Sequence, residues 1–230
     1  MQREMYMYNE IAREHSLFEG LTDAEYSNAL KLFSAEWRKH LRGTMLSRQG
    51  DVMQKFGLIA SGNVQIYSYD MDGTSNMMAS VERGGTFAEA ICYLKEPVYV
   101  HIFAETDTMV LWLDPSHIMQ INVRHTPLER KLMNRFTAML ARKAIGMNER
   151  IQVLSKITLR EKLVTLFSQC VARYGTMQFT LPYDRQGMAA YLGTNRSALS
   201  RELSNMKAEG LIDFHKNSFV IKNKAEYSLW

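Results

Sequence analysis

The chain has 230 residues, of which 46% are hydrophobic and 23% are charged, and its formal net charge is +4. This composition is that of an ordinary globular protein and differs from that of a disordered chain. No stretch approaches the roughly 20 consecutive apolar residues that a membrane span requires, and the N-terminus has no signal-peptide core, so we expect a cytoplasmic protein. Cys92 and Cys170 are the only cysteines. Two are too few for a disulfide framework or a cysteine-ligated iron–sulfur cluster, and we expect no metal site.

The charge is distributed unevenly along the chain. Residues 1–125 carry 11 Lys/Arg and 16 Asp/Glu, residues 126–150 carry 6 and 2, and residues 151–230 carry 11 and 6. A basic C-terminal third is typical of proteins that bind polyanions, because neutralised phosphates release their counterions. A solvated basic face without such a partner would give the same count.

Residues 1–125 have the pattern of a β-rich domain. Seven of the 13 glycines fall between residues 43 and 85 and separate short alternating runs. Residues 65–69 and 77–81 alternate like paired strands around Asp72-Gly73, which suits a tight hairpin turn. These features predict a small antiparallel sandwich or barrel that ends near residue 113.

Residues 126–155 are predicted to form one long helix. A heptad seam for a partner helix is predicted at Met133, Thr137, Leu140, Ala144, Met147, Ile151 and Leu154, so we expect a dimer. These positions without Thr137 are our predicted dimer interface. A second apolar stripe on the same helix, at Leu132, Phe136 and Met139, would face the sheet of its own chain. The alternative to a dimer is a single buried core helix in a monomer.

Local signals mark several further helix ends. The stretch Thr22 to Glu25 can cap a short amphipathic helix. Residues 158–174 read as a helix that stops at Gly175, and residues 176–182 read as a strand. Residues 184–203 then read as helix, tight turn at Gly193, helix, with Asp184 and Asn195 as the two helix caps. The apolar inner faces of this helix pair would be Met188, Ala189, Leu192, Leu199, Leu203 and Met206.

Residues 209–221 look like a β-hairpin wing behind this helix pair, so residues 156–230 read as a winged helix-turn-helix. An arginine on the outer face of the second helix can donate two hydrogen bonds to one guanine. For the fragment alone, a surface helix with an Arg201 salt bridge is an equal alternative. We expect phosphate contacts from Lys207, Lys216, Lys222 and Lys224. The expected DNA-binding residues are Arg185, Gln186, Asn195, Arg196, Ser197, Ser200 and Arg201.

Two motifs carry a resemblance to a known family. Residues 192–203 (LGTNRSALSREL) resemble the recognition-helix signature of the Crp/Fnr family of bacterial regulators, and residues 85–90 (GTFAEA) resemble its effector cassette of glycine, aromatic, glycine and glutamate. The resemblance implies an α+β protein: an N-terminal β-roll of the cyclic-nucleotide-binding type, which is a double-stranded jelly roll, then a dimerisation helix and a winged helix-turn-helix. Many members carry glutamate where this chain has Ser197.

By the same resemblance the chain is a dimeric, sequence-specific transcription regulator. Its partners would be double-stranded DNA with a palindromic operator, a second copy of itself, RNA polymerase and a small-molecule effector. Binding of that effector, or a redox or gas signal, at the β-roll and the long helix would control the affinity for DNA.

The effector site departs from the family pattern. In members that bind cyclic nucleotides an Arg-Ser pair neutralises the phosphate, but residues 95–101 read KEPVYVH and contain no arginine. A phosphate without that partner loses a charge-assisted contact, so we expect that cyclic AMP is not the effector. Glu89 could instead brace its turn, and His101 could be an ordinary strand residue. The expected effector-binding residues are Glu89, Tyr99, His101, Met147 and Asn148.

The cofactor and two other functions stay open at this point. Haem remains an alternative, with His101, His117 or a methionine as the axial ligand. A cyclic-nucleotide sensor that acts through protein partners is the second hypothesis. An enzyme ranks lowest, because the sequence has no P-loop, no HExxH zinc motif and no GxSxG motif.

Overall fold

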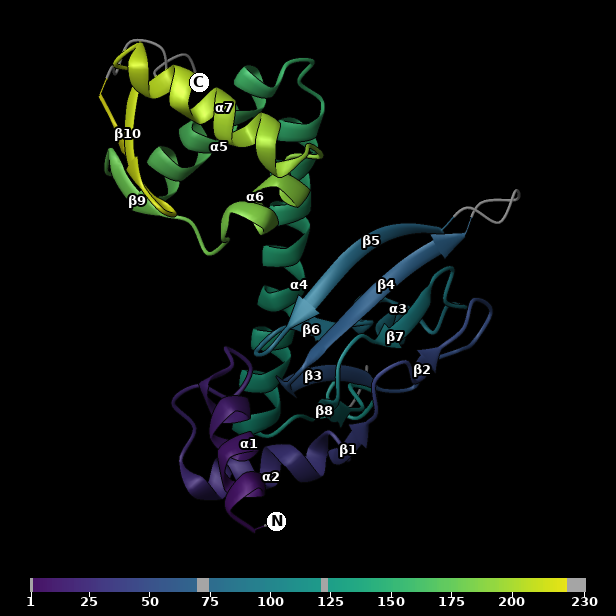
Figure 1. Ribbon diagram of the computed structural model, residues 1–230. Coiled ribbons are helices and arrows are strands. Elements are labelled where there is room, and N and C mark those ends of the chain that lie inside the picture. The colour runs from purple at the N-terminus through teal and green to yellow at the C-terminus, as the bar shows by residue number, and fades with distance from the viewer. Residues whose placement is uncertain (1, 70–74, 121–123, 223–230) are drawn as a thin grey trace. The chain divides into compact units, whose positions relative to one another are not determined.

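The computed structural model describes residues 2–69, 75–120 and 124–222 (Figure 1). The chain divides into two compact units, residues 1–141 and residues 142–230, which we describe separately as the first and the second unit. The long helix α4 (Pro127–Leu154) contributes residues to both units. It lies within the helix predicted at residues 126–155. The limits of the three predicted domains, residues 1–125, 126–155 and 156–230, stay predictions.

Two four-stranded antiparallel sheets form the first unit, with strand orders β1-β8-β3-β6 and β2-β7-β4-β5. Figure 1 shows β4 and β5 as a long hairpin at one side of this unit. The predicted α+β fold with a β-roll is confirmed. The strands are β1 (Glu36–His40), β2 (Met45–Ser47), β3 (Phe56–Ser61), β4 (Asn63–Tyr69), β5 (Ser75–Glu82), β6 (Thr86–Phe87), β7 (His101–Ala104) and β8 (Thr108–Leu113).

The two runs that were predicted to form a hairpin are paired in the structure. In the β4–β5 ladder Gln65 lies opposite Ser80, and Tyr69 lies opposite Ser75. The predicted turn at Asp72-Gly73 lies outside the described residues. Every second side chain of the strands points between the two sheets, because successive residues of a strand face opposite ways. The apolar cluster between the sheets includes Ile59, Val64, Phe87, Val100, Ile102, Val110 and Trp112.

The helices that accompany these sheets in the described residues are α1 (Gln2–Glu14), α2 (Asp23–Leu32), α3 (Glu89–Leu94) and the first part of α4. The predicted cap of α2 is confirmed. The amide of Glu25 donates to Thr22 Oγ1 at 3.2 Å, and the amide of Thr22 donates to Glu25 Oε2 at 2.9 Å. This reciprocal pair satisfies two amides that would otherwise lack partners at the start of the helix.

The α4 helix begins with a similar arrangement at Thr126 and Glu129. The Thr126 amide donates to Glu129 Oε2 at 2.6 Å, and the Glu129 amide donates to Thr126 Oγ1 at 3.2 Å. The Thr126 amide, followed by the side chains of His117 and Thr126, lowers the pKa of Glu129 to about 2. Glu129 therefore stays ionised throughout the physiological range.

The two stripes of α4 have different surroundings. Leu132, Phe136 and Met139 are buried in the core of the first unit, and the Phe136 ring lies 5.4 Å from that of Phe56. This agrees with the prediction that the second stripe packs on the sheet of its own chain. In the predicted heptad seam, Met133 and Leu140 are half-buried, and the exposed positions are Thr137, Ala144, Met147, Ile151 and Leu154.

The second unit consists of the end of α4, three further helices and a three-stranded antiparallel sheet of order β10-β11-β9. The elements are α5 (Leu159–Tyr174), β9 (Gln178–Thr180), α6 (Arg185–Tyr191), α7 (Arg196–Ala208), β10 (Ile212–His215) and β11 (Ser218–Ile221). The predicted end of α5 is correct: Gly175 caps it with a φ of +65°. The predicted inner faces are also correct, since Met188, Ala189, Leu192, Leu199, Leu203 and Met206 are all buried.

No helix among the residues that the structure describes has the length and apolar character needed to cross a bilayer.

Candidate nucleic-acid interface and effector site

A tight turn connects α6 to α7. Gly193 has a φ of +62°, a left-handed conformation that glycine adopts without the steric cost other residues incur. The amide of Thr194 donates to the carbonyl of Ala189 at 3.0 Å. A Cβ atom at Gly193 would lie 3.5 Å from Leu154 Cδ2, so this turn packs on the last turn of α4. The predicted position of the turn is confirmed.

Both helices of the pair begin at their predicted caps. Asp184 Oδ1 accepts from the amide of Gly187 at 2.7 Å, and Asn195 Oδ1 accepts from the amide of Ala198 at 2.8 Å. These bonds fix where α6 and α7 start. The exposed first turn of α7, with its positive helix-dipole end, is therefore a place where anions are favoured.

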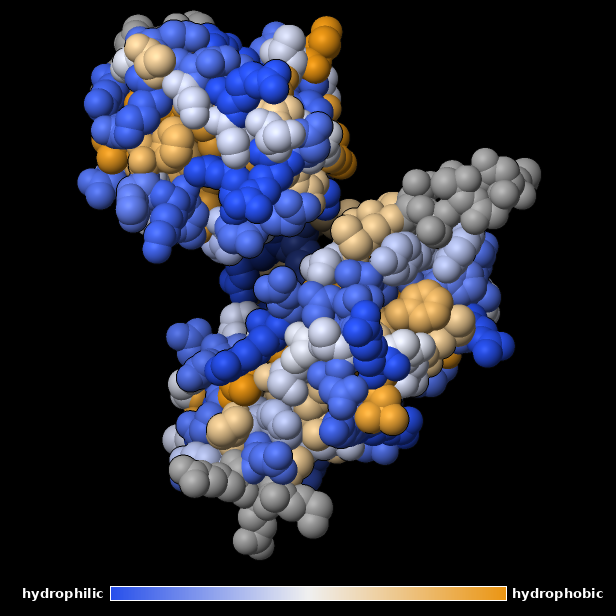
Figure 2. All heavy atoms as spheres, viewed as in Figure 1, coloured by the Kyte–Doolittle hydropathy of each residue, from blue (hydrophilic) through white to orange (hydrophobic). Residues whose placement is uncertain are grey.

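The exposed face of α7 carries two arginines without partners. Arg196 and Arg201 are exposed, and within the described residues neither makes a hydrogen bond or an ion pair. The alternative of an Arg201 salt bridge is not found there. By contrast, Arg160 is held by Glu202 and Glu209, at 2.6 Å in each case. Hydrophilic residues dominate the visible face of the second unit over α6 and α7 (Figure 2).

A shallow hollow gathers most of the predicted contact residues. It is lined by Gln186, Thr194, Asn195, Arg196, Ser197 and Ser200. The Ser197 hydroxyl donates to Asn195 Oδ1 at 2.7 Å, and the Ser200 hydroxyl donates to the carbonyl of Arg196 at 2.9 Å. In these positions both hydroxyl oxygens are left to accept hydrogen bonds. Thr194 was missed by the sequence analysis, although it stands directly beside the turn glycine.

Arg185 has a different environment from the other predicted contacts. Its guanidinium donates to the carbonyl of Lys216 at 2.9 Å and lies 5.2 Å from the centre of the Phe214 ring. Burial, together with the nearby charge of Arg196, lowers the pKa of Arg185. Arg185 thus holds the tip of the β10–β11 hairpin against α6, a role that its place in the sequence does not reveal.

Two of the lysines predicted to meet phosphates have carboxylate partners. Asp213 accepts from Lys207 at 2.6 Å and from Lys222 at 3.4 Å. Lys207, the Phe214 amide and Lys222 together lower the pKa of Asp213 to about 2. Lys216 is exposed at the tip of the wing, whereas Lys224 lies outside the described residues.

Glu89, the first of the predicted effector residues, is only 4% exposed and starts the short helix α3. Ala88 precedes it with a φ of +67°, a left-handed conformation that is unfavourable for alanine. Ala88 stands where the effector cassette of the resembled family has a glycine. The turn before Glu89 therefore has the left-handed backbone that glycine favours, although alanine stands there.

We expect Ala88→Gly to stabilise the protein. The left-handed conformation costs about 1–2 kcal/mol for a residue with a Cβ, of which the greater freedom of glycine in the unfolded chain cancels about 0.5–1 kcal/mol. The free energy of unfolding, measured by urea denaturation, should rise by up to about 1.5 kcal/mol. Ala90→Gly, inside α3, should lower it by a similar amount and serves as the control. A loss of stability in Ala88→Gly would contradict the assigned backbone conformation.

The other predicted effector residues of the first unit do not lie inside the roll. Val100 and Ile102 are buried between the sheets, whereas Tyr99 is 69% exposed and His101 alternates with them on the opposite face. The His101 ring lies 4.9 Å from the ring of Tyr69, and its Nδ1 atom is buried without a hydrogen-bond partner in the described residues. The structure thus does not bring Tyr99 and His101 to the interior of the roll.

Met147 and Asn148, the last two predicted effector residues, are both exposed on α4. They belong to the second unit, whereas Glu89, Tyr99 and His101 belong to the first. Helical register was the only basis for predicting them, and they stay predictions.

The residues of the roll do not fit a cyclic phosphate. The stretch that matches the family's Arg-Ser pair, residues 95–101, contains no arginine. Within it Tyr99 is largely exposed, and Val100 is buried in the apolar cluster. Lys95 is the only cation between residues 89 and 101, and it is exposed in a left-handed turn. Of the haem ligand candidates, His117 has its Nε2 2.9 Å from Glu129 Oε1. Among the described residues no three His, Cys, Asp or Glu side chains form a metal-binding group.

Comparisons with known proteins agree with this architecture. Residues 37–125 match the family model of the cyclic nucleotide-binding domain, and residues 159–226 match that of the Crp-like helix-turn-helix domain. The chain is 24% identical over 209 residues to a cyclic AMP receptor protein of Thermus thermophilus, covering 91% of this chain and 93% of that protein.

Two solved structures illustrate the likeness in fold. The catabolite activator protein of Thermus thermophilus has a TM-score of 0.50 at 24% identity, with 92% of this chain and 96% of that chain covered. A putative cAMP-binding regulatory protein of Silicibacter pomeroyi has a TM-score of 0.54 at 22% identity, with 96% and 97% covered.

A β-roll of the cyclic-nucleotide-binding type followed by a Crp-like helix-turn-helix defines a DNA-binding transcription regulator with an effector-binding domain. The chain belongs to the Crp/Fnr family. This family consists of transcription regulators and not of enzymes, in line with the low rank given to catalysis above.

Proposed function

We propose that the protein is a homodimeric regulator that binds a palindromic operator through α7 and responds to an effector other than a cyclic nucleotide. The observation that carries the proposal is the pair of exposed arginines, Arg196 and Arg201, on the helix that follows the Gly193 turn; neither has a side-chain partner in the part of the chain that the structure describes. The specificity would come from contacts to base edges, and Asn195 would position the start of the helix. The residues that would read the bases are Gln186, Arg196, Ser197, Ser200 and Arg201. RNA polymerase is the proposed protein partner at the promoter.

The proposed dimer rests on the exposed part of α4. Met147 is 66% exposed and Ile151 is 60% exposed, although both are apolar and stand at seam positions. Exposed apolar side chains repeated with heptad spacing along one helix indicate a partner helix. Two α7 helices in a symmetric dimer would read two half-sites, which explains why a palindrome is expected.

Selection of bound sequences from random duplex DNA, followed by footprinting, tests this proposal. We expect an inverted repeat, protected on one face of the duplex, whose affinity falls as salt increases. Recovery of random sequences, or a single unrepeated half-site bound by a monomer, would contradict it. Saturable binding of a cyclic nucleotide in the absence of any DNA binding would support the alternative of a signalling module that acts through proteins.

We expect cyclic AMP to bind the purified full-length protein only weakly. A cyclic phosphate at residues 95–101 lacks the bidentate contact that arginine makes in the family pattern, a loss of about 1.5–3 kcal/mol, or roughly 10- to 150-fold in affinity. Isothermal titration with cyclic AMP should therefore show a dissociation constant well above the low micromolar range. Tyr99→Arg, within the stretch that matches the family's Arg-Ser pair, is the restoring control. A dissociation constant in the low micromolar range for the unaltered protein would overturn this expectation.

The proposed effector site retains Glu89, because a buried carboxylate at the start of a helix beside the apolar cluster can bind a donor group of a ligand. Tyr99, His101, Met147 and Asn148 stay weaker candidates. An absorbance spectrum and a native mass spectrum of the purified protein would reveal a retained ligand or haem.

A further inference from the structure

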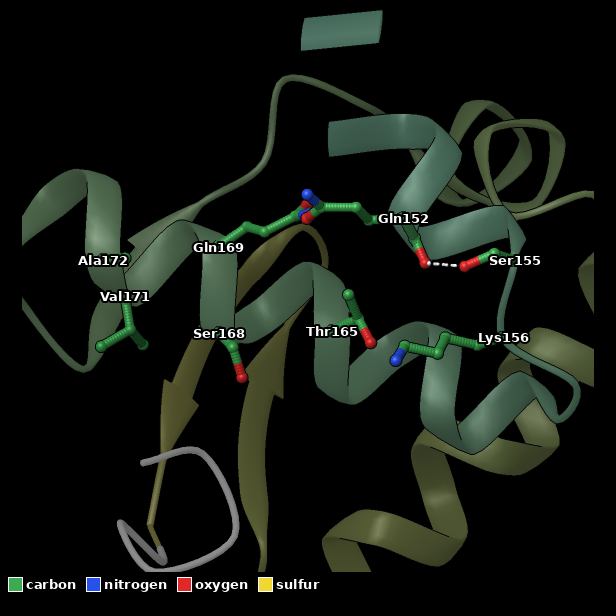
Figure 3. Close-up of a pocket in the computed structure, with 8 residues that line it drawn as sticks. All are labelled: Gln152, Ser155, Lys156, Thr165, Ser168, Gln169, Val171 and Ala172. Atoms are coloured by element: carbon green, nitrogen blue, oxygen red, sulfur yellow. Dashed lines mark hydrogen bonds between the residues drawn. The ribbon is translucent and has the colours of Figure 1, made fainter. Parts of the chain in front are cut away.

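A cavity in the second unit lies outside both sites described above. It has a volume of about 500 Å³ and is bordered by the last turn of α4, the segment after it and one face of α5. Figure 3 shows Thr165, Ser168 and Val171 on successive turns of α5, with the side chain of Lys156 extending toward Thr165. Cavities of about 300–1,000 Å³ are typical of small-molecule sites.

Ser168 supplies an observation that points to a ligand. The residue is only 9% exposed, and its Oγ atom is buried without a hydrogen-bond partner in the described residues. Buried hydroxyls almost always have a partner, because an unpaired one loses its bonds to water and gains nothing in return. A ligand with a polar atom near Ser168 would satisfy this hydroxyl.

The other hydroxyl groups of the cavity already donate their hydrogens. The Thr165 hydroxyl donates to the carbonyl of Glu161, and the Ser155 hydroxyl donates to the carbonyl of Gln152, each at 2.8 Å. The side-chain Nε2 of Gln169 donates to Gln152 Oε1 at 3.2 Å. Ser168 is therefore the hydroxyl, among the described lining residues, that still has a hydrogen to donate.

The charge and the apolar lining indicate the class of ligand. Lys156 is the only charged residue among the described residues that line the cavity, and it stands at one end. Val171 and Ala172 form the apolar opposite end. A cation at one end and an apolar wall at the other suit an anion that carries a hydrocarbon body.

We propose that this cavity binds a small amphipathic carboxylate. Its carboxylate lies at Lys156, one of its oxygens accepts from the Ser168 hydroxyl, and its hydrocarbon chain extends along α5 toward Val171 and Ala172. A chain of about eight carbons suits the cavity volume. The site is separate from α7 and from the roll, so it does not depend on the proposed DNA-binding function.

Isothermal titration of the full-length protein with sodium octanoate tests the proposal, and octan-1-ol is the matched uncharged probe. We expect saturable binding of one octanoate per chain with a dissociation constant below about 1 mM, and at least tenfold weaker binding of octan-1-ol. Lys156→Met should weaken octanoate binding at least tenfold, whereas Lys39→Met, which removes an exposed lysine of the first unit, should leave it unchanged.

Two further variants separate occupancy from misfolding. Ser168→Leu removes the donating hydroxyl and occupies part of the cavity, so it should weaken binding at least tenfold. Ala172→Glu, at an exposed position, should weaken binding through charge repulsion without disturbing the core. Thermal unfolding of each variant without ligand reports its folding. No binding of octanoate at about 5 mM, equal affinity for octan-1-ol, or unchanged affinity in folded Lys156→Met and Ala172→Glu would each overturn the proposal.

Discussion

Replacement of Arg201 by alanine is expected to lower the affinity for the selected operator about 10- to 100-fold. A bidentate arginine–guanine pair contributes about 1–3 kcal/mol of discrimination against the wrong base. Because Arg201 makes no bond to the described part of the protein, its loss should leave the fold intact. Fluorescence anisotropy with operator and scrambled duplexes measures both affinities, and most of the loss should fall on the operator.

Two control variants distinguish base reading from charge. Arg201→Lys keeps the charge but not the planar fork, so we expect it to lose discrimination while the salt dependence stays unchanged. Arg38→Ala removes an equal charge from the first unit, where Arg38 pairs with Glu36 at 2.8 Å, and should bind the operator normally. Full discrimination by Arg201→Ala would rule out base reading by this residue.

The second large effect is expected at the seam of α4. Ile151→Glu should convert the dimer into a monomer, because two buried isoleucines per dimer would contribute about 3 kcal/mol or more and two like charges would replace them. The dimer dissociation constant should rise at least about a hundredfold, as measured by sedimentation equilibrium. Operator affinity should fall as well, since a monomer reads only one half-site.

Gln152→Glu is the matched control for Ile151→Glu. It introduces the same negative charge one residue from Ile151, outside the seam, so the protein should remain dimeric. Circular dichroism of both variants checks that α4 is intact. If Ile151→Glu stays as dimeric as the unaltered protein, α4 is not the dimer interface. A monomeric unaltered protein would contradict the proposed dimer directly.

Local signals in the sequence predicted the helix starts well. Thr22, Asp184 and Asn195 each accept a hydrogen bond from the amide three residues further along, so the information that defines each helix start lies within a few residues. Periodicity was equally informative for the buried stripe Leu132, Phe136 and Met139, since packing on a sheet requires one face of a helix to be apolar.

Contacts between distant residues limited the prediction of the candidate sites. Lys207 and Lys222 were expected to meet phosphates, but each has Asp213 as a partner through the fold of the wing. Arg185 bonds to Lys216, which is 31 residues away. These pairings depend on how the β10–β11 hairpin packs on α6 and α7, which residue spacing alone does not specify.

By itself, the sequence determined the order of the β-roll, the long helix and the winged helix-turn-helix, the Gly193 turn with its two caps and the absence of an arginine from residues 95–101. Those features depend on residue identity and on spacing over one or two helical turns. Only the tertiary structure decided that Tyr99 and His101 lie outside the interior of the roll, that Ala88 holds a left-handed turn, and that Ser168 lines a cavity. Strand facing, backbone strain and cavities arise from packing between elements, which becomes defined only when the whole chain has folded.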